Sequence, residues 1–319
     1  GAGGRTGRDG LHGATFSSIA LDQESETVSS TAVQIGDPIT EKKLADALLE
    51  ARDRSLFSAV TDCGAGGLSS AVGEMGAACG ARVELDRVPL KYAGLTPTEI
   101  WISESQERMV LAVPKDRLKQ LLALFQERKV EAVSIGEFTE TGRLELLFRG
   151  VKVGELKMDF LHGGLPQPPR PARWRKPAFP EPSVRPPEEI SEWLLRLLRR
   201  WDTCSKEWIV RQYDHEVQGG SVLKPISLGP SDAAVLRPRL DSFRGIVLAN
   251  GINFRYGDLD PYWMAALAIE EVVRQVVAVG GSLDRLAILD NFCWGDPTRM
   301  DVLGSLVRAA LGCYDAAKE

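Results

Sequence analysis

Histidine and cysteine, which bind most structural metals in proteins, are scarce in this sequence of 319 residues. The three histidines, His12, His162 and His215, lie too far apart to form a local metal motif. The five cysteines are scattered and include no Cys-x-x-Cys pair. These absences argue against structural zinc and against a disulfide framework, and they favour a protein of the reducing cytoplasm.

Long hydrophobic runs and an excess of positive charge are also missing. No apolar run reaches the roughly 18–20 residues of a membrane span, and no signal peptide is recognised. The formal net charge is −5, so the chain has no general electrostatic attraction for nucleic acid or for an anionic membrane. With 44% hydrophobic and 26% charged residues, the sequence predicts a globular protein of about two domains of ~150 residues each.

The first half of the chain mixes strand and helix patterns, which is typical of an α/β or α+β domain that ends near residue 163. Asp37 and Pro38 mark one helix start, and Leu44 and Leu48 give that helix an apolar face. The predicted strands are one or two within 15–35, then 60–62, 82–86, 108–113, 144–148 and 151–157. The predicted helices are 39–52, 68 to about 79, a helix from 97, and 116–128.

Residues 166–188 contain nine prolines and several basic side chains. Proline fixes φ and removes a backbone donor, so this segment is predicted to be an extended linker. A nucleic-acid-binding arm is the alternative, and the acidic net charge of the chain makes it the weaker one. The residues that such an arm would use are Arg170, Arg173, Trp174, Arg175 and Lys176.

The second half begins with an apolar stripe at helical spacing, which predicts a helix packed on a hydrophobic core. The stripe consists of Ile190, Trp193, Leu194, Leu197, Leu198 and Trp201. The predicted elements that follow are strands at 232–237 and 245–250, a long helix at 261–279, a buried strand at 285–289 and a helix at about 298–318. Asp290 stands at the carboxyl end of the buried strand, where open α/β sheets collect ligands.

The most informative stretch lies at residues 102–109, where three charged groups, two hydroxyls and an amide separate two apolar runs. Before it, Thr96 can cap a helix, Pro97 suits the first helical position, and Glu99 completes a capping box. After it a strand begins. Water is scarce at a joint between a helix and a buried strand, so these polar groups need partners, either protein atoms or a ligand.

The sequence Ser-Glu-Ser-Gln-Glu-Arg-Met at 103–109 resembles the signature of the synthetase subunit of phosphoribosylformylglycinamidine synthase (PurL). Four further segments agree with this family in order and spacing, and the resemblance covers nearly the whole chain. They are Gly-Gly-Arg-Thr-Gly-Arg-Asp-Gly-Leu-His-Gly-Ala at 3–14, Val-Gln-Ile-Gly-Asp-Pro at 33–38, Asp-Cys-Gly-Ala-Gly-Gly at 62–67 and Asp-Asn-Phe-Cys-Trp-Gly-Asp-Pro at 290–297.

The resemblance implies an α/β (α+β) fold in two related halves. Residues 1–165 are expected to form an AIR-synthetase-like ligand domain, and residues 189–319 the beginning of an AIR-synthetase-like ATP-binding domain, joined by the linker at 166–188. The chain opens inside a glycine-rich motif and stops within a helical pattern. We therefore expect an internal piece of a longer protein, truncated at both ends.

In the resembling family, the aspartate that matches Asp62 is a magnesium ligand. The position suits this chemistry, because a glycine-rich turn before a helix start accepts phosphate and a carboxylate can hold Mg²⁺. A tight packing turn is the alternative for these glycines. The family also implies a substrate contact at Gln34, whose amide can both donate and accept, whereas a glutamine that satisfies loop backbone is the alternative.

The family's substrate-binding triplet matches Glu104, Ser105 and Gln106. We expect Ser105 and Gln106 to contact the substrate and Arg108 to support them, and the alternative is a polar network that ties Arg108 to an acidic neighbour. The resemblance implies nucleotide contact at Asp290, which could instead only cap a loop. The segment 3–14 could line a phosphate pocket, but the sequence assigns no individual roles to Arg5, Arg8, Asp9 and His12.

The function implied is ATP-dependent amidation of formylglycinamide ribonucleotide to its amidine in de novo purine biosynthesis, with Mg²⁺. Ammonia would come from a glutaminase subunit (PurQ), and a small subunit (PurS) would be a further partner. The alternatives are another ATP-dependent enzyme of the same superfamily, such as aminoimidazole ribonucleotide synthetase, and a non-catalytic nucleotide-binding scaffold. We expect the isolated piece to be inactive.

Overall fold

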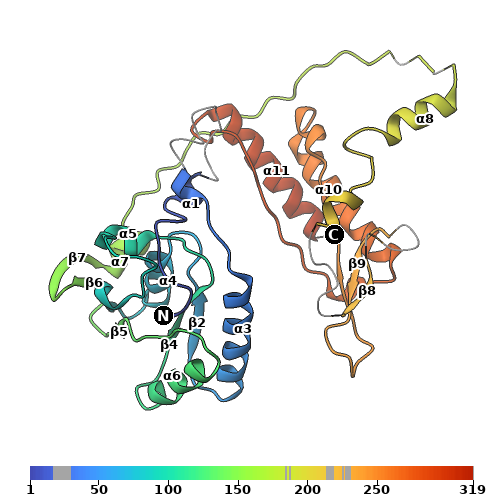
Figure 1. Cartoon of the computed structure of the whole chain (residues 1–319). Coiled ribbons are helices and arrows are strands. Elements are labelled where there is room, and N and C mark those ends of the chain that lie inside the picture. Colours follow the sequence, from blue (N-terminus) through green and yellow to red (C-terminus); the bar gives the residue numbers. More distant parts are fainter. Residues whose placement is uncertain are drawn as a thin grey trace. The chain divides into compact units, whose positions relative to one another are not determined.

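The computed structural model describes residues 1–16, 30–183, 185–186, 188–212, 219–224, 226 and 231–318. The chain divides into two compact units, Gly1–Gln167 and Pro168–Glu319 (Figure 1). His215 and most of the segment 15–35, where the sequence predicts one or two strands, lie outside the described residues. Every helix in the described ranges is too short or too polar to span a bilayer.

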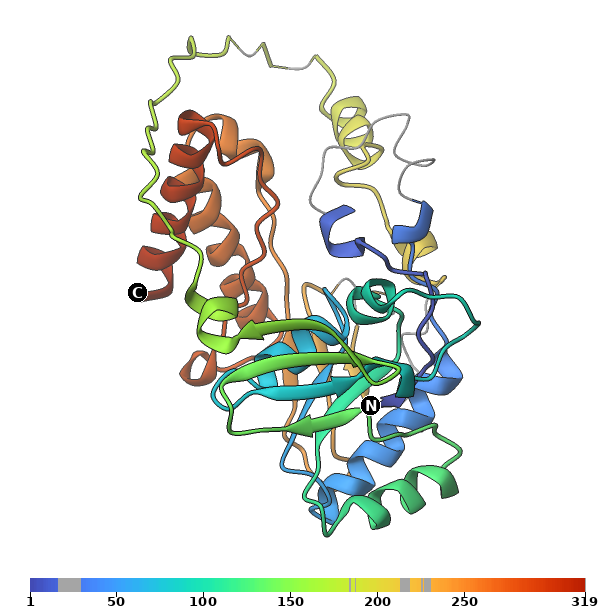
Figure 2. The same cartoon turned by 90° about the vertical axis from the view of Figure 1, so that its left-hand side faces the viewer.

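The first unit contains two sheets. Three antiparallel strands form the smaller sheet in the order β1-β4-β2, and four strands form the larger one in the order β5-β3-β6-β7 (Figure 2). In the larger sheet β3 and β6 are parallel, while the other pairs are antiparallel. The strands are β1 (Ala2–Gly3), β2 (Ala59–Asp62), β3 (Ala81–Glu84), β4 (Arg108–Ala112), β5 (Gly136–Phe138), β6 (Arg143–Phe148) and β7 (Val151–Lys157).

Two hydrophobic clusters hold the helices of the first unit on these sheets. One joins α3, α6 and the smaller sheet, and the fully buried Phe125 is its largest residue. The other joins α4, α5, α7 and the larger sheet around Val72, Ile100 and Met158. The helices are α1 (Gly13–Phe16), η1 (Ser30–Ala32), α3 (Pro38–Asp53), α4 (Leu68–Met75), η2 (Leu85–Arg87), α5 (Pro97–Ile102), α6 (Leu118–Glu127) and α7 (Met158–Gly163).

The helix starts that the sequence predicts are confirmed. The Asp37 side chain accepts from the backbone N–H of Thr40, with Pro38 in the first turn of α3. At α5, the Thr96 hydroxyl accepts from the N–H of Glu99 at 3.2 Å, and the Glu99 carboxylate accepts from the N–H of Thr96 at 2.7 Å. This capping box satisfies N–H groups that the first helical turn leaves without intrahelical partners.

The prediction of a strand ending near Val33 and Ile35 is wrong for the described part of that segment. Residues 30–32 form the 3-10 helix η1, and residues 33–37 form no strand. The carbonyl of Thr31 accepts from the N–H of Leu11, so this segment pairs with the N-terminal loop instead of entering a sheet ladder. Val33 and Ile35 are consequently exposed.

The second unit contains a three-stranded antiparallel sheet and two long helices that pack against each other through small residues. Gly312 of α11 lies so close to α10 that a Cβ atom there would stand 2.3 Å from the carbonyl oxygen of Tyr262. The elements are α8 (Ile190–Leu198), α9 (Glu207–Val210), β8 (Ser221–Leu223), β9 (Ala234–Leu236), β10 (Ile246–Leu248), η3 (Phe254–Asp258), α10 (Pro261–Ala278), η4 (Leu283–Arg285) and α11 (Met300–Lys318).

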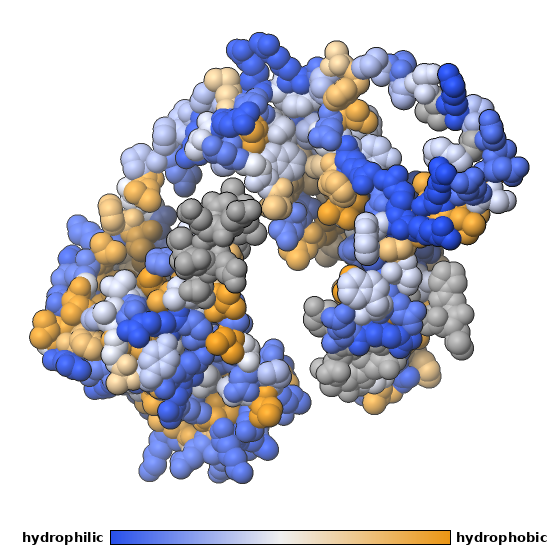
Figure 3. Space-filling view, turned by 45° about the horizontal axis from the view of Figure 1, so that its top comes forward, coloured by the Kyte–Doolittle hydropathy of each residue, from blue (hydrophilic) through white to orange (hydrophobic). Residues whose placement is uncertain are grey.

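Two predictions for the second unit are wrong. The apolar stripe at 190–201 forms the helix α8 as far as Leu198, but none of the stripe residues is buried, and Trp201 beyond the helix is 81% exposed. Residues 286–290 form no strand, and Leu289 is 96% exposed, so Asp290 does not stand at a strand end. Both predictions require a packing surface that the described residues do not supply. Figure 3 shows hydrophobic residues, in orange, on the visible surface.

The close contact between Gly67 and Ser103 gives a prediction for stability. Gly67 has φ 59° and ψ −131°, and a Cβ atom there would lie 1.9 Å from the Ser103 carbonyl oxygen. Replacing Gly67 with Ala should lower the free energy of unfolding of the first unit by about 3 kcal/mol or more, through backbone strain and overpacking. Urea unfolding followed by circular dichroism measures this loss.

Gly142 is the matched control, since its φ is 64° but a Cβ atom there would meet nothing within 4 Å. Gly142→Ala should cost only about 1–2 kcal/mol, the strain of the left-handed backbone alone. Equal losses in the two variants would contradict the close approach at Gly67.

Candidate functional site

A cluster of buried polar side chains lies where α5 ends and β4 begins. Of the six polar or charged residues that are buried in the described ranges, five belong to it: Thr6, Ser103, Glu104, Ser105 and Arg108. The sequence predicts that polar groups at this joint need partners. The structure shows that protein atoms supply the partners of the buried members.

The Glu104 carboxylate connects three segments that are far apart in the sequence. It is 3% exposed and accepts hydrogen bonds from the N–H of Gly66 at 2.9 Å, the N–H of Ala14 at 3.0 Å and the side-chain amide of Gln34 at 3.1 Å. A carboxylate has about four acceptor sites, so these bonds use most of its capacity. Glu104 therefore holds together the N-terminal loop, the segment before α3 and the glycine-rich turn.

Gln34 and Gln106 form a solvent-accessible pair above Glu104. The side-chain amide nitrogen of Gln106 donates to the amide oxygen of Gln34 at 2.5 Å, and Gln34 in turn donates to Glu104. Gln34 is exposed and Gln106 is half-buried. The sequence-predicted residues Gln34, Glu104 and Gln106 are thus brought together, and the two amides face solvent where a ligand could bind.

Ser105 is fully buried, which differs from the direct substrate contact expected from the sequence. Its hydroxyl accepts from the N–H of Gly7 at 2.9 Å and donates to the Asp9 carboxylate at 2.9 Å. Burial raises the pKa of Asp9, but hydrogen bonds from Lys91 and Ser105 outweigh it and leave this pKa below its ordinary value. Ser105 therefore fixes the N-terminal loop beneath the amide pair.

Arg108 stabilises the loop between α5 and β4, which is the supporting role that the sequence predicts. Its guanidinium donates to the carbonyl of Ser105 at 2.7 Å, to the hydroxyl of Thr6 at 2.9 Å and to the carbonyl of Ser103. Burial lowers the pKa of Arg108 below its ordinary value. The bonds to Ser103 and Ser105 hold the backbone on both sides of Glu104, and the bond to Thr6 ties this loop to the N-terminal segment.

Asp62 is exposed at the end of β2, directly before the glycine-rich turn that leads into α4. The turn is closed by a hydrogen bond from the N–H of Gly67 to the Gly64 carbonyl, and a Cβ atom on Gly64 would lie 2.6 Å from the Asp62 carboxylate. The described residues contain no cluster of three metal-ligating side chains, so Asp62 offers a single carboxylate.

The charged residues of the segment 3–14 are engaged with the body of the first unit. Arg5 pairs with Glu131 at 2.7 Å, and Arg8 pairs with Glu99 at 2.7 Å. A phosphate pocket lined by these two arginines would require both pairs to open. His12 is exposed at φ 59°.

Asp290 belongs to the second unit and is exposed. Burial raises the pKa of the Cys313 thiol on α11, and the Asp290 carboxylate beside it raises that pKa further. Asp290 thus lies near Cys313 of α11.

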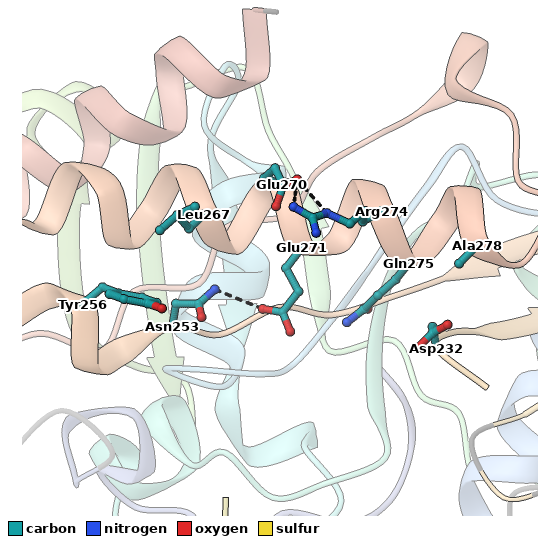
Figure 4. A pocket seen from close by; sticks show the side chains of 9 residues that line it. All are labelled: Asp232, Asn253, Tyr256, Leu267, Glu270, Glu271, Arg274, Gln275 and Ala278. Carbon is teal, nitrogen blue, oxygen red and sulfur yellow. Dashed lines mark hydrogen bonds and ion pairs between the residues drawn. The ribbon is translucent and has the colours of Figure 1, made fainter. Parts of the chain in front are cut away.

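A cavity of about 440 Å³ in the second unit was not found by sequence reasoning. Figure 4 shows α10 side chains facing Asn253 and Tyr256, which lie at the start of η3 and within it. Glu271 accepts from Asn253 at 3.0 Å, Glu270 pairs with Arg274, and the side-chain oxygen of Gln275 is buried without a partner among the described residues. The lining residues are Asp232, Asn253, Tyr256, Leu267, Glu270, Glu271, Arg274, Gln275 and Ala278.

The adjacent Glu270 and Glu271 on a helix predicted at 261–279 were the available signal for this cavity. Acidic neighbours on a helix are more often a solvated face, so the pattern alone did not distinguish the two cases. Asp232 and Asn253 come from separate loops, and only the fold brings them near α10.

Two family models match the chain. The C-terminal domain of AIR synthase related protein matches residues 3–149, and the N-terminal domain of AIR synthase related protein matches residues 230–319. The chain carries two AIR synthase related domains. Together with the mixed helices and strands, these matches confirm the predicted α/β (α+β) fold class, with the C-terminal-type domain first and the N-terminal-type domain second.

The resemblance to PurL is also confirmed. Phosphoribosylformylglycinamidine synthase subunit PurL of Methanothermobacter marburgensis is 39% identical over 320 residues, which is 99% of this chain and 43% of that protein. The subunit of Thermococcus gammatolerans is 40% identical over 321 residues, again 99% of this chain and 43% of that protein. The chain thus spans less than half the length of the curated relatives that it matches.

Solved structures of a bacterial PurL share this fold. T. maritima PurL complexed with FGAR has a TM-score of 0.78 and 30% identity, covering 99% of this chain and 48% of that one. T. maritima PurL complexed with ATP has a TM-score of 0.67 and 26% identity, with 99% and 46% covered. The structure of PurLQS from Thermotoga maritima has a TM-score of 0.71 and 27% identity, with 99% and 47% covered.

The Glu99 ion pair predicts a specific pH dependence of stability. The hydrogen bond from Arg8, followed by that from the Thr96 backbone, lowers the pKa of Glu99 to about 2. A carboxyl whose folded-state pKa is depressed stabilises the protein above its ordinary pKa, and this contribution is lost as pH falls toward the folded-state value. Glu99→Gln should therefore weaken the first unit at neutral pH and flatten the acid side of its stability profile.

Urea unfolding between pH 2 and pH 7 measures this profile, with Glu140→Gln as a control at an exposed turn position. The difference between Glu99→Gln and wild type should be largest above about pH 5 and should shrink toward pH 2. A difference that stays constant with pH would show that Glu99 titrates normally.

Proposed function

We propose that this chain is part of the synthetase subunit of a phosphoribosylformylglycinamidine synthase, which uses ATP and ammonia to convert formylglycinamide ribonucleotide (FGAR) to its amidine in purine biosynthesis. The observation that carries the proposal is the Gln34–Glu104–Gln106 constellation. Four sequence segments that resemble PurL meet there, because Glu104 also accepts hydrogen bonds from Ala14 and Gly66. The accessible side chains are the amides of Gln34 and Gln106, which suit an amide substrate.

The proposed division of the chain is a ligand domain at 1–165, a linker at 166–188 and a nucleotide-binding domain at 189–319. Free cysteines throughout the described chain are consistent with a cytoplasmic location. The partners are a glutaminase subunit (PurQ) and a small subunit (PurS), which the similarity to PurLQS supports.

In the proposed reaction, Gln34 and Gln106 orient the substrate, since a primary amide can donate to a carbonyl and accept from an N–H or hydroxyl at once. Glu104 fixes the orientation of Gln34, while Ser105 and Arg108 keep the loop rigid. Transfer of phosphate from ATP to the substrate amide oxygen makes that oxygen a leaving group, and ammonia then displaces it.

Asp62 fits the role of a magnesium ligand. Mg²⁺ is usually bound through one or two carboxylates together with substrate phosphates, and Asp62 presents one exposed carboxylate beside a glycine-rich turn. When bound, the ion supplies neutralisation of phosphate charge. Asp62 would hold the ion, and the glycines of the turn would let a phosphate approach the backbone.

We further propose that the cavity of the second unit binds a nucleotide. Its volume of about 440 Å³ lies within the ~300–1,000 Å³ range of ligand pockets. Asp232 and Glu271 offer carboxylates for a phosphate-bound cation, and Gln275 offers an unpaired amide oxygen. Asp290 does not line this cavity, and a nucleotide contact at Asp290 is proposed only from the family resemblance.

The first experiment is an assay of ADP release by the full-length protein with ammonia, Mg²⁺ and ATP. Ammonia-dependent turnover of FGAR would support the proposed synthetase. Turnover of the amidine product alone would indicate aminoimidazole ribonucleotide synthetase, which the AIR synthase related domains make the nearest alternative. Absence of turnover with both substrates would favour a non-catalytic scaffold.

Substitution of Gln106 tests its proposed substrate contact in the same assay. Gln106→Ala should raise the KM for FGAR about tenfold or more, because it removes one hydrogen bond to the substrate and releases Gln34. Asp62→Asn should instead lower kcat, because it removes the negative charge of the proposed magnesium ligand. Gln126→Ala, at an exposed position of α6, is the control. An unchanged KM in Gln106→Ala would refute the proposed contact.

Substitution of Glu271 tests the nucleotide cavity independently of turnover. Glu271→Ala should weaken binding of Mg·ADP about tenfold, as measured by isothermal titration calorimetry. Glu207→Ala on α9, which lies outside the cavity, should leave the affinity unchanged. If both variants bind Mg·ADP as tightly as wild type, the nucleotide does not occupy this cavity.

A further inference from the structure

Part of the linker contacts the helix α11. The backbone N–H of Arg173 donates to the Met300 carbonyl at 3.0 Å, at the start of α11. One turn later the linker crosses Gly304, where a Cβ atom would lie 2.2 Å from the Arg173 carbonyl carbon. Figure 1 shows the yellow-green linker passing this end of α11. Both segments belong to the second unit.

Arg308 stacks on Trp174, the aromatic side chain of residues 170–177. Its guanidinium carbon lies 4.2 Å from the ring centre of Trp174 and 5.2 Å from that of Tyr262. The guanidinium also makes a bidentate ion pair with Asp260, with distances of 2.7 and 2.8 Å. Because Asp260 fixes the plane of the guanidinium, Trp174 can stack on a rigid cation.

The basic side chains of the linker lie near acidic groups of the same unit. The hydrogen bond from Arg308 is the main cause of the lowered pKa of Asp260, and the charge of Lys176 lowers it further. At Asp296, hydrogen bonds from Thr298 lower the pKa most, and the charge of Arg170 adds to them. The linker therefore complements the acidic residues at the starts of α10 and α11.

We propose that residues 170–177 form a strap that binds α11 and the start of α10 as part of the second unit, with Trp174 as its anchor and Gly304 as the crossing point. The surface formed by Asp260, Asp296, Gly304 and Arg308 is thus an intramolecular docking site whose occupant is the basic, proline-rich linker. The basic residues of the linker serve this surface and do not form a nucleic-acid-binding arm.

Trypsin cleavage of the full-length protein tests the strap. Trypsin does not cut before proline, so Arg173–Trp174 and Arg175–Lys176 are the linker bonds open to it. A docked strap resists cleavage, because the protease needs a locally unfolded segment. Intact-mass spectrometry of the products over time gives the rate at each bond.

The variant Gly304→Ala distinguishes an effect on strap docking from an effect on the stability of α11. Alanine has a higher helix propensity than glycine, so α11 itself should be stabilised while the new methyl group displaces the strap. The cleavage rates should rise about tenfold or more, with the helical signal in circular dichroism preserved. Unchanged cleavage rates in this variant would overturn the proposal.

Two linker substitutions provide the anchor test and its control. Trp174→Ala should accelerate cleavage at Arg175–Lys176, a bond that this change does not alter directly. Phe179→Ala removes another aromatic side chain of the linker that is 60% exposed, and it should leave the rate within about twofold of wild type. Equal acceleration by both variants would show a flexible linker without a specific anchor.

Discussion

Burial of one carboxylate organises the first unit. An ionised carboxylate away from water is stable only when hydrogen bonds replace its hydration, and Glu104 obtains them from residues 14, 34 and 66. The donors are two backbone N–H groups and one side-chain amide, so the loops that carry them must approach closely. A side chain at Gly13 or Gly67 would block that approach. Glycine at these two positions meets this requirement.

The site separates into a buried part that sets geometry and an accessible part that can meet a ligand. Arg108 and Ser105 use their hydrogen bonds on their own loop and on the N-terminal segment, and the lowered pKa of Arg108 reflects the cost of burying its charge. Gln34 and Gln106 remain accessible above them. Because the buried bonds fix the backbone, the two amides lose little conformational entropy when a substrate binds.

Features that depend on neighbouring residues could be predicted from the sequence, whereas those that depend on distant surfaces could not. The capping box of Thr96 and Glu99 needs only residues three positions apart. The burial of α8 and a strand at 285–289 both require a partner surface, and the described residues provide none. Family resemblance grouped Gln34 with Glu104, but only the structure shows Ser105 turned inward.

The linker shows why composition alone leaves function open. Prolines and arginines are compatible with a free tether, a nucleic-acid-binding arm and a docked strap. The contacts that favour the strap come from Gly304 and Arg308, more than a hundred residues away. Proline restricts the unbound segment, so docking costs less entropy than it would for a flexible chain, and one stacked tryptophan can then suffice as an anchor. The role of such a segment therefore depends on the charged surface that it contacts.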